Sequence, residues 1–171
     1  MLNIGELSKD SVYEVMRELL YSFNYAWFLM DDWIKKNHPD DVNNKDLMGL
    51  AEEFGAYEAK RLSRVLDTSD RGIERLIHFL NHSHWAIFEE IGSEKISEMS
   101  FTMKTFDCST QRAAKKWGME YYDCSEQGCR IREGFFREIH PDARVERIFT
   151  PPDKRMDGIE ERISCEWLIT L

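Results

Sequence analysis

The first part of the chain carries apolar residues at helical spacing. From Val12 to Ile34 they recur every three or four positions, which predicts one long amphipathic helix. Asp10 or Ser11 would cap its start, because either side chain can accept a hydrogen bond from a free helix N–H group. The segment NHPDDVNN at 37–44 favours turns, so we expect the helix to end before it.

Two further helices follow from the same pattern. Apolar residues at helical spacing over 47–65 predict the second helix. The third would begin after Ser69 or Asp70 and carry its apolar stripe as far as Phe88. We expect Gly92 to close it, because glycine is common just past the end of a helix.

In the second half of the chain the period changes. Alternation predicts strands at 100–106, 144–149 and 163–171. Two short helices are predicted between them, at 109–118 and 125–141. The last strand places one set of residues on a single face: Ile163, Cys165, Trp167, Ile169 and Leu171.

This order of elements predicts the fold class. Helices first and mostly antiparallel strands later indicate an α+β fold, with helices covering one side of the sheet. The length of 171 residues fits a single domain. We divide it into a helical half at 1–92 and a cysteine-containing half at 93–171.

The charge of the chain narrows the classes of partner. There are 23 Lys and Arg residues against 32 Asp and Glu residues, a formal net charge of −9. Nucleic acids and anionic membranes attract basic surfaces, so we expect neither as a partner. The N-terminus has no basic segment followed by an apolar run, and the uncharged stretch at 19–30 is too short to cross a bilayer. We therefore expect a cytoplasmic protein, in which thiols stay reduced and disulfides are rare.

Two short segments echo each other, DCSTQ at 107–111 and DCSEQ at 123–127. Each sets a cysteine directly before a predicted helix, and the two remaining cysteines are Cys129 and Cys165. Unpaired N–H groups at a helix start lower the pKa of a nearby thiol, although the preceding aspartates act in the opposite direction. In the alternative interpretation, Ser109 and Ser125 are N-cap residues in capping boxes, and the side chains of Gln111 and Gln127 bond back to the helix start. The cysteines are then small apolar residues buried in the core.

The last strand adds a third thiol. In so small a domain we expect Cys108, Cys124 and Cys165 to meet in one pocket. Cys129 lies about 140° round the helix from Cys124 and should point elsewhere. Tight C-x-x-C pairs are absent, which disfavours structural zinc. The three converging thiols are a weak alternative site for zinc or another soft metal.

A second weak alternative metal site lies in the third helix. Glu74, His78 and His82 are spaced i, i+4, i+8 and form one column. The column lies at the edge of the apolar stripe, which favours solvated helix surface as its structure.

The second half of the chain carries an ordered set of short motifs: Cys108-x-x-Gln111, Gly118, Cys124-x-x-x-Gly128, Phe135-Phe136, Ile139-His140-Pro141, Pro151-Pro152-Asp153 and Cys165-x-Trp167. In this set it resembles a family of bacterial and archaeal cytosolic proteins grouped with L-2-amino-thiazoline-4-carboxylate hydrolase. The helix containing Trp27 and the Glu58–Arg61 region match that family more loosely. A fainter likeness is to the vinyl-reductase-like small-molecule-binding domains.

Two positions depart from the family pattern. The family usually has a cysteine directly before Pro-Pro-Asp, where this chain has Thr150, and this argues against a site of four thiolates. The family's arginine in the helix after Cys108 is replaced by Ala114, with Arg112 and Lys115 beside it.

The resemblance implies a hydrolase that opens a cyclic amidine-like ring at a C–N or C–S bond. Cys124 would be the nucleophile, with Cys108 or Cys165 as its pocket partner and Asp153 as the acid/base. Arg112 or Arg130 would bind a substrate carboxylate. Three further residues would contact the substrate: Gln111, Cys165 and Trp167.

Two alternatives stay open at this point. The same pocket without turnover would belong to a sensor or carrier of a small ligand or soft metal. Thiols that only fill the core would belong to an interaction protein. We expect a small-molecule ligand or substrate as the partner and require no cofactor, and the sequence leaves the oligomeric state open, a homo-oligomer included.

Overall fold

Helices and antiparallel strands make up the described part of the chain, which confirms the predicted α+β fold. The structure is a computed structural model that describes residues 8–38, 45–66, 69–155 and 157–171. Within these ranges there are six α-helices and one four-stranded sheet. The chain divides into two units, Met1–Asn44 and Lys45–Leu171.

The described part of the first unit is helix α1 (Lys9–Asn37). Its N-cap is Ser8, whose hydroxyl oxygen accepts a hydrogen bond from the Ser11 amide at 3.1 Å. The helix therefore begins slightly earlier than predicted. Of the turn predicted at 37–44, residues 39–44 lie outside the described residues.

The second unit is built on an antiparallel sheet with the strand order β1-β2-β4-β3. The strands are β1 (Glu90–Ser97), β2 (Ser100–Asp107), β3 (Arg144–Phe149) and β4 (Cys165–Thr170). Strand β1 was not predicted, and the expectation that Gly92 closes a helix was wrong, because Gly92 lies inside this strand. As an exposed edge strand, β1 lacks the apolar alternation that identified the others.

The predicted third helix is two helices, α3 (Gly72–Leu80) and α4 (His84–Phe88). Between them the Ser83 hydroxyl donates a hydrogen bond to the Leu80 carbonyl at 2.7 Å. The apolar spacing continues across this break, which is why the sequence predicted one helix. The second predicted helix is α2 (Lys45–Leu62).

The two short helices of the second half are present as α5 (Ser109–Lys116) and α6 (Ser125–Ile139). Gly118 follows α5 with a φ of 75°, a left-handed conformation that favours glycine. Pro141 follows α6, as predicted.

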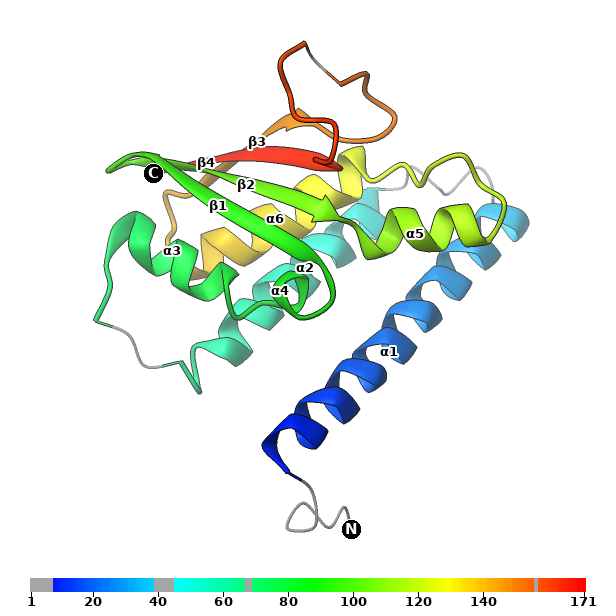
Figure 1. Cartoon of the computed structure of the whole chain (residues 1–171), viewed down its shortest axis with the longest axis horizontal. Helices are drawn as coiled ribbons and strands as arrows, with labels where there is room; N and C mark the ends of the chain where they lie inside the picture. Colours follow the sequence, from blue (N-terminus) through cyan, green and yellow to red (C-terminus); the bar gives the residue numbers. More distant parts are fainter. Residues whose placement is uncertain (1–7, 39–44, 67–68, 156) are drawn as a thin grey trace. The chain divides into compact units, whose positions relative to one another are not determined.

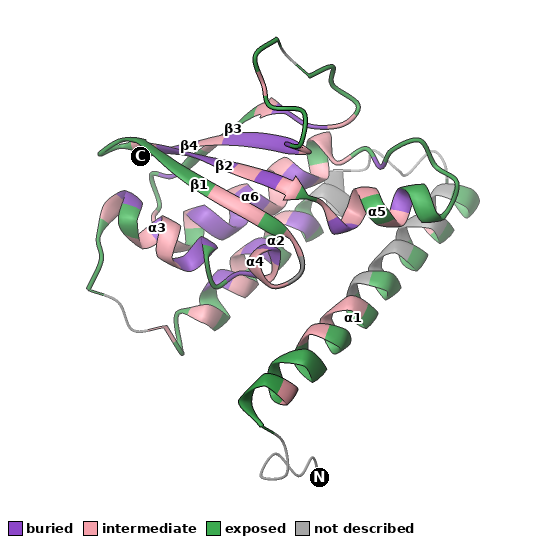
Figure 2. Ribbon diagram, viewed as in Figure 1, coloured by how far each residue is buried: buried purple, intermediate pink, exposed green. Residues whose placement is uncertain are grey.

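Helices α2, α3 and α6 cover one face of the sheet (Figure 1). Figure 2 shows buried residues concentrated on α6, β2 and β4. The predicted inward face of the last strand is confirmed, since Ile163, Cys165, Trp167 and Ile169 are all buried.

Two glycines set the close crossing of α2 and α6. A Cβ atom at Gly55 would overlap the carbonyl of Ile131, and one at Gly134 would overlap the carbonyl of Glu52. The helices can approach this closely only because both positions lack a side chain. This contact holds the α6 residues in place below the sheet.

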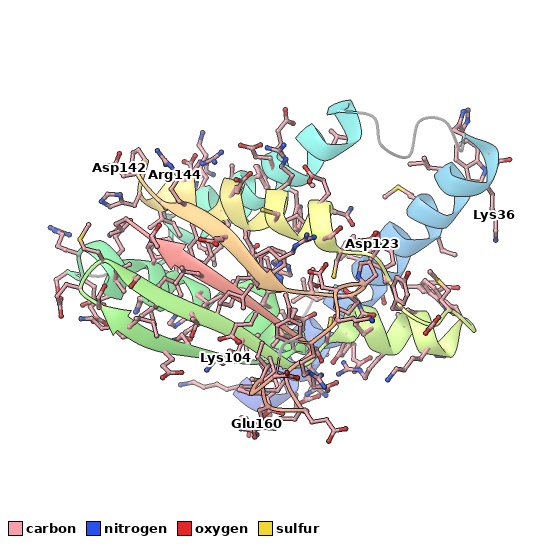
Figure 3. All side chains as sticks on the ribbon, turned by 90° about the horizontal axis from the view of Figure 1, so that it is seen from above. Lys36, Lys104, Asp123, Asp142, Arg144 and Glu160 are labelled. Carbon is pink, nitrogen blue, oxygen red and sulfur yellow. The ribbon has the colours of Figure 1, made fainter. Side chains whose placement is uncertain are left out.

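The opposite face of the sheet is polar. Lys104 on β2 lies 2.7 Å from Glu94 and 3.8 Å from Glu166. The hydrogen bond with Glu94, together with the charges of Glu166 and Glu160, raises the pKa of Lys104 (Figure 3). Cys165, the one cysteine within the sheet, lies on the helix-covered side with Trp167, and Lys104 and its glutamates lie on the other.

Candidate functional site

Three elements each present one cysteine at an end. Cys108 is the N-cap residue of α5, Cys124 is the N-cap residue of α6, and Cys165 is the first residue of β4. Cys165 pairs in register with Thr105 on β2, shortly before Cys108. All four cysteines of the chain are free thiols.

The three thiols lie near enough to influence one another. Cys165 is buried, and Cys108 and Cys124 are partly buried. Burial raises the pKa of Cys108, followed by the charges of Glu89 and Cys165, with Cys124 adding a smaller effect. Burial also raises the pKa of Cys124, and Cys165 adds to it. Cys165 thus acts on both other thiols, as expected for three cysteines in one region.

Cys129 has different neighbours. Burial raises its pKa first, and then the charges of Glu133 and Glu126 on its own helix. It packs against the apolar core from a partly buried position. The prediction that Cys129 points away from the other thiols agrees with these contacts.

Cys108 contacts a carboxylate that sequence reasoning missed. Its S–H group donates to Oε1 of Glu89 at 3.7 Å, and the Ser109 hydroxyl donates to the same oxygen at 2.9 Å. Glu89 is the residue between α4 and β1, where no sequence motif marks it. The break between these two elements places its carboxylate at the start of α5.

Cys124 lies among hydrogen-bonding groups. Its sulfur is 3.1 Å from the Thr150 hydroxyl, and the Gln111 amide Nε2 donates to it at 3.7 Å. Thr150 is fully buried. Because its hydroxyl contacts the Cys124 sulfur, this residue belongs to the thiol cluster.

Gln111 also fixes the segment before α6. Its Nε2 donates to the Tyr122 carbonyl at 2.8 Å, and its Oε1 accepts from the Tyr122 amide at 3.0 Å. The Tyr122 hydroxyl donates to Gln127 at 2.9 Å. The two glutamines of the repeated DCS segments thus hold the α5–α6 connection, which positions Cys124.

The capping-box reading of the DCS segments was wrong. The cysteines themselves occupy the N-cap positions, and neither makes a side-chain cap hydrogen bond. Ser109 bonds Glu89 instead, and Ser125 donates to Asp123 at 2.6 Å (Figure 3). At the helix start of α5 the Gln111 backbone N–H does lower the pKa of Cys108, as expected, but burial has the larger effect and raises the pKa of both cysteines.

A tryptophan and an arginine line the cluster on the sheet side. Trp167 on β4 is fully buried, and its indole N–H donates to Cys165 Sγ at 3.3 Å. The guanidinium of Arg132 on α6 lies 4.5 Å from the Trp167 ring centroid and 4.8 Å from that of Trp85. Its charge lowers the pKa of Cys124, opposing the effect of burial.

Gly128 lies between Cys124 and Arg132 on α6, at a position where a side chain would crowd the site. A Cβ atom there would lie 3.3 Å from Arg132 Nη1, 3.4 Å from the Trp167 ring and 3.6 Å from Cys124 Cβ. Cys124, Gly128 and Arg132 are spaced i, i+4, i+8 and form one column of α6. Glycine at the middle position leaves room between the thiol and the guanidinium.

The two arginines expected to bind a carboxylate lie in exposed ion pairs instead. Arg112 pairs with Asp107, and Arg130 lies 2.9 Å from Glu126 and 3.3 Å from Glu133. Arg132 is two positions after Arg130, about 200° round the helix, and faces the thiols. The spacing of Cys124, Gly128 and Arg132 at i, i+4 and i+8 was the sequence signal that could have identified Arg132.

Asp153 holds a turn. Its carboxylate accepts from the Thr150 amide at 3.2 Å and lies 3.3 Å from Arg147 Nε. These contacts make it a positioning residue for Thr150, and through Thr150 for Cys124. The acid/base role expected for Asp153 stays a prediction. Glu89 is a second carboxylate, in direct contact with the Cys108 thiol.

The weak metal alternatives are not assembled. Within the described residues, no group of three or more His, Cys, Asp or Glu side chains is placed to hold a metal ion. Glu74 pairs with Lys95 at 2.8 Å, and His78 lies 3.9 Å from Asp70. His82 Nδ1 is 2.8 Å from the His78 carbonyl.

Fold and site together define a class: an α+β protein with a buried cluster of three thiols, an arginine and two tryptophans between sheet and helix. Residues 7–171 match the family described as "Family of unknown function (DUF6125)", and the chain belongs to that family. No curated protein matches the chain. None of the helices in the described part of the chain is both long enough and apolar enough to pass through a membrane.

Proposed function

We propose that this protein binds and processes a small molecule at Cys108, Cys124 and Cys165, as a hydrolase that opens a cyclic amidine-like ring. The observation that carries the proposal is the placement of three thiols by three separate elements. Gln111 of α5, the helix that Cys108 caps, bonds Cys124, and Cys165 pairs with Thr105 on the strand that leads to Cys108. Thiols that only fill a core do not need partners such as the carboxylate of Glu89 or the hydroxyl of Thr150. The resemblance to thiazoline-carboxylate hydrolases supplies the class of reaction.

Cys124 is the better nucleophile of the three. The Thr150 hydroxyl, the Gln111 amide and the Arg132 charge all stabilise its thiolate. Cys108 instead faces the carboxylate of Glu89, which disfavours a second negative charge. Because burial raises the pKa of Cys124, its proton has to be removed as substrate binds.

Glu89 is the group we assign to proton transfer. In the resting protein Glu89 bonds the Cys108 thiol. The proton of the Cys124 thiol therefore reaches Glu89 through Cys108, which accepts this proton as it gives its own to Glu89, while the Cys124 sulfur attacks the ring carbon between nitrogen and sulfur. The ring C–S bond breaks, and the leaving sulfur takes the proton from Glu89. Water then attacks the enzyme-bound carbon, losing a proton to Glu89. Cys124 departs and is reprotonated, and a ureido product with a free thiol is released.

The test is turnover of 2-amino-2-thiazoline-4-carboxylate by the whole chain. Hydrolysis adds the mass of one water and generates one new thiol per molecule, both measurable by mass spectrometry. Cys124→Ser should abolish turnover, whereas Cys129→Ser, the matched control on the same helix, should retain it. Unchanged turnover in Cys124→Ser removes this residue from the mechanism.

A second candidate is a sensor that binds a small ligand without turnover. The raised pKa values of Cys108 and Cys124 favour it, because the resting protein then carries thiols and not thiolates. It predicts a stoichiometric ligand on the purified protein in native mass spectrometry and no product from the thiazoline substrate. A product in the turnover assay rules it out.

A further inference from the structure

Arg132 is a buried cation. Its residue is only 6% exposed, and its guanidinium is stacked between the rings of Trp85 and Trp167. The other α6 arginines, Arg130 and Arg137, are more exposed than Arg132 and pair with glutamates. Arg132 alone of these three is enclosed between the helix and the sheet.

The charge of Arg132 has no carboxylate partner among the described residues. The guanidinium donates one hydrogen bond, from Nη1 to the Gly128 carbonyl at 2.9 Å, and its buried Nε finds no acceptor. Glu89, the carboxylate that contacts one of the thiols, bonds Cys108 and Ser109 instead. Burying an unpaired ion is unfavourable by several kcal/mol, and the two rings recover about 2 kcal/mol or less each.

A second polar group near the thiols also has no partner. The Thr105 hydroxyl is fully buried, and its Oγ1 makes no hydrogen bond. Thr105 pairs with Cys165 across β2 and β4, and their side chains share the helix-covered face. The region of the thiols therefore offers donors to a ligand from two sides.

We propose that Arg132, assisted by Thr105, is an anion-binding subsite that holds a carboxylate or a comparable small oxyanion of the ligand beside Cys124. An anion would supply the acceptor that Nε lacks and neutralise the buried charge. Gly128 leaves the space between guanidinium and thiol in which such a group can lie. The inference builds on the thiol cluster of the proposed function and names the class of its substrate. Anion binding does not itself require that Cys124 perform chemistry.

A pair of alkylating reagents tests this subsite. Iodoacetate and iodoacetamide are nearly equal in size and carry the same reacting carbon, but only iodoacetate is an anion. A cysteine thiolate attacks this carbon, iodide leaves, and the thiol proton passes to the buffer. The reduced whole chain is treated with each reagent at about pH 8.5, near the ordinary thiol pKa. The rate at each cysteine is followed by peptide mass spectrometry.

Cys129 is the internal control, because it lies on the same helix beside Glu126 and Glu133. We expect the ratio of the iodoacetate rate to the iodoacetamide rate to be about tenfold higher at Cys124 than at Cys129, as one charge-assisted hydrogen bond would give. Arg132→Gln should abolish the difference at Cys124 and leave Cys129 unchanged. Arg132→Lys, which keeps the charge, should preserve part of it.

Wild-type protein supplies a second readout that needs no variant. Sodium acetate should slow iodoacetate at Cys124 and not at Cys129, whereas acetamide should slow neither. Equal ratios at Cys124 and Cys129, or no protection by acetate, would overturn the anion subsite and leave the thiol chemistry standing. If Cys129 reacts while Cys124 resists both reagents, no small molecule reaches the region, and both proposals fail.

Discussion

At the residue scale, the contacts of Cys124 show what Thr150, the residue before Pro-Pro-Asp, contributes to the thiol cluster. The Thr150 hydroxyl lies 3.1 Å from Cys124 Sγ and lowers its pKa against the effect of burial. A fourth thiol there would add a sulfur that burial keeps protonated. A hydroxyl gives the neighbouring sulfur a hydrogen-bond donor instead.

The first prediction concerns this hydroxyl. Thr150→Val keeps the shape of the side chain and removes the donor, so the pKa of Cys124 should rise further. Its alkylation by iodoacetamide at fixed pH should slow about three- to tenfold, the value of one hydrogen bond. Thr150→Ser is the matched control and should react as the wild type does. A Val variant that reacts at the wild-type rate would show that the hydroxyl does not act on this sulfur.

Sequence reasoning identified the three thiols but not the charged groups around them. The cysteines occur in recognisable motifs, and alternation placed Cys165 on the inner face of β4. Glu89 could not be found, because it reaches Cys108 only through the break that ends α4 and begins β1. Arg112 and Arg130 were chosen for their position near the motifs, whereas burial and stacking, visible only in three dimensions, single out Arg132.

At the element scale, the site depends on the close crossing of α2 and α6. Gly55 and Gly134 allow each helix to touch the backbone of the other. The sequence predicted both helices from their apolar spacing but gave no signal for this contact. The edge strand β1 was missed for a related reason, since its polar residues face solvent and carry no alternation.

The second prediction is that Gly134→Ala destabilises the fold. The added Cβ would overlap the carbonyl of Glu52, so the helices must separate, and we expect a loss of about 3 kcal/mol in the free energy of unfolding. The measurement is chemical denaturation followed by circular dichroism.

Gly49 provides the matched control on the partner helix. A Cβ there meets no atom within 4 Å, so Gly49→Ala should leave the fold intact and stabilise it by about 0.5–1 kcal/mol. Equal stabilities of the two variants would contradict the account of the helix crossing.

At the scale of the whole molecule, the buried thiols link stability to pH. Burial raises the pKa of Cys108 above its ordinary value of 9.0, so the folded state keeps a proton that the unfolded state loses. The stabilisation is complete below pH 9.0 and is lost as pH rises above that value.

The third prediction follows from this loss of stability at high pH. The free energy of unfolding should fall above pH 9.0 with a limiting slope of about 1.4 kcal/mol per pH unit for each thiol that stays protonated. Cys108→Ser removes one such group and should make the fall less steep. Denaturation curves between about pH 8 and pH 10 measure both slopes. An identical slope in the variant would mean that Cys108 titrates normally in the folded protein.

The most direct test of the central claim, that three thiols share one region open to small molecules, is crosslinking with dibromobimane. This reagent becomes fluorescent when two thiolates displace both of its bromides, so it reports thiols that lie close together. We predict a fluorescent product in the native protein that joins Cys124 to Cys108 or Cys165, is lost in Cys124→Ser and persists in Cys129→Ser. A native protein that gives no intramolecular crosslink, or one that requires Cys129, would contradict the account.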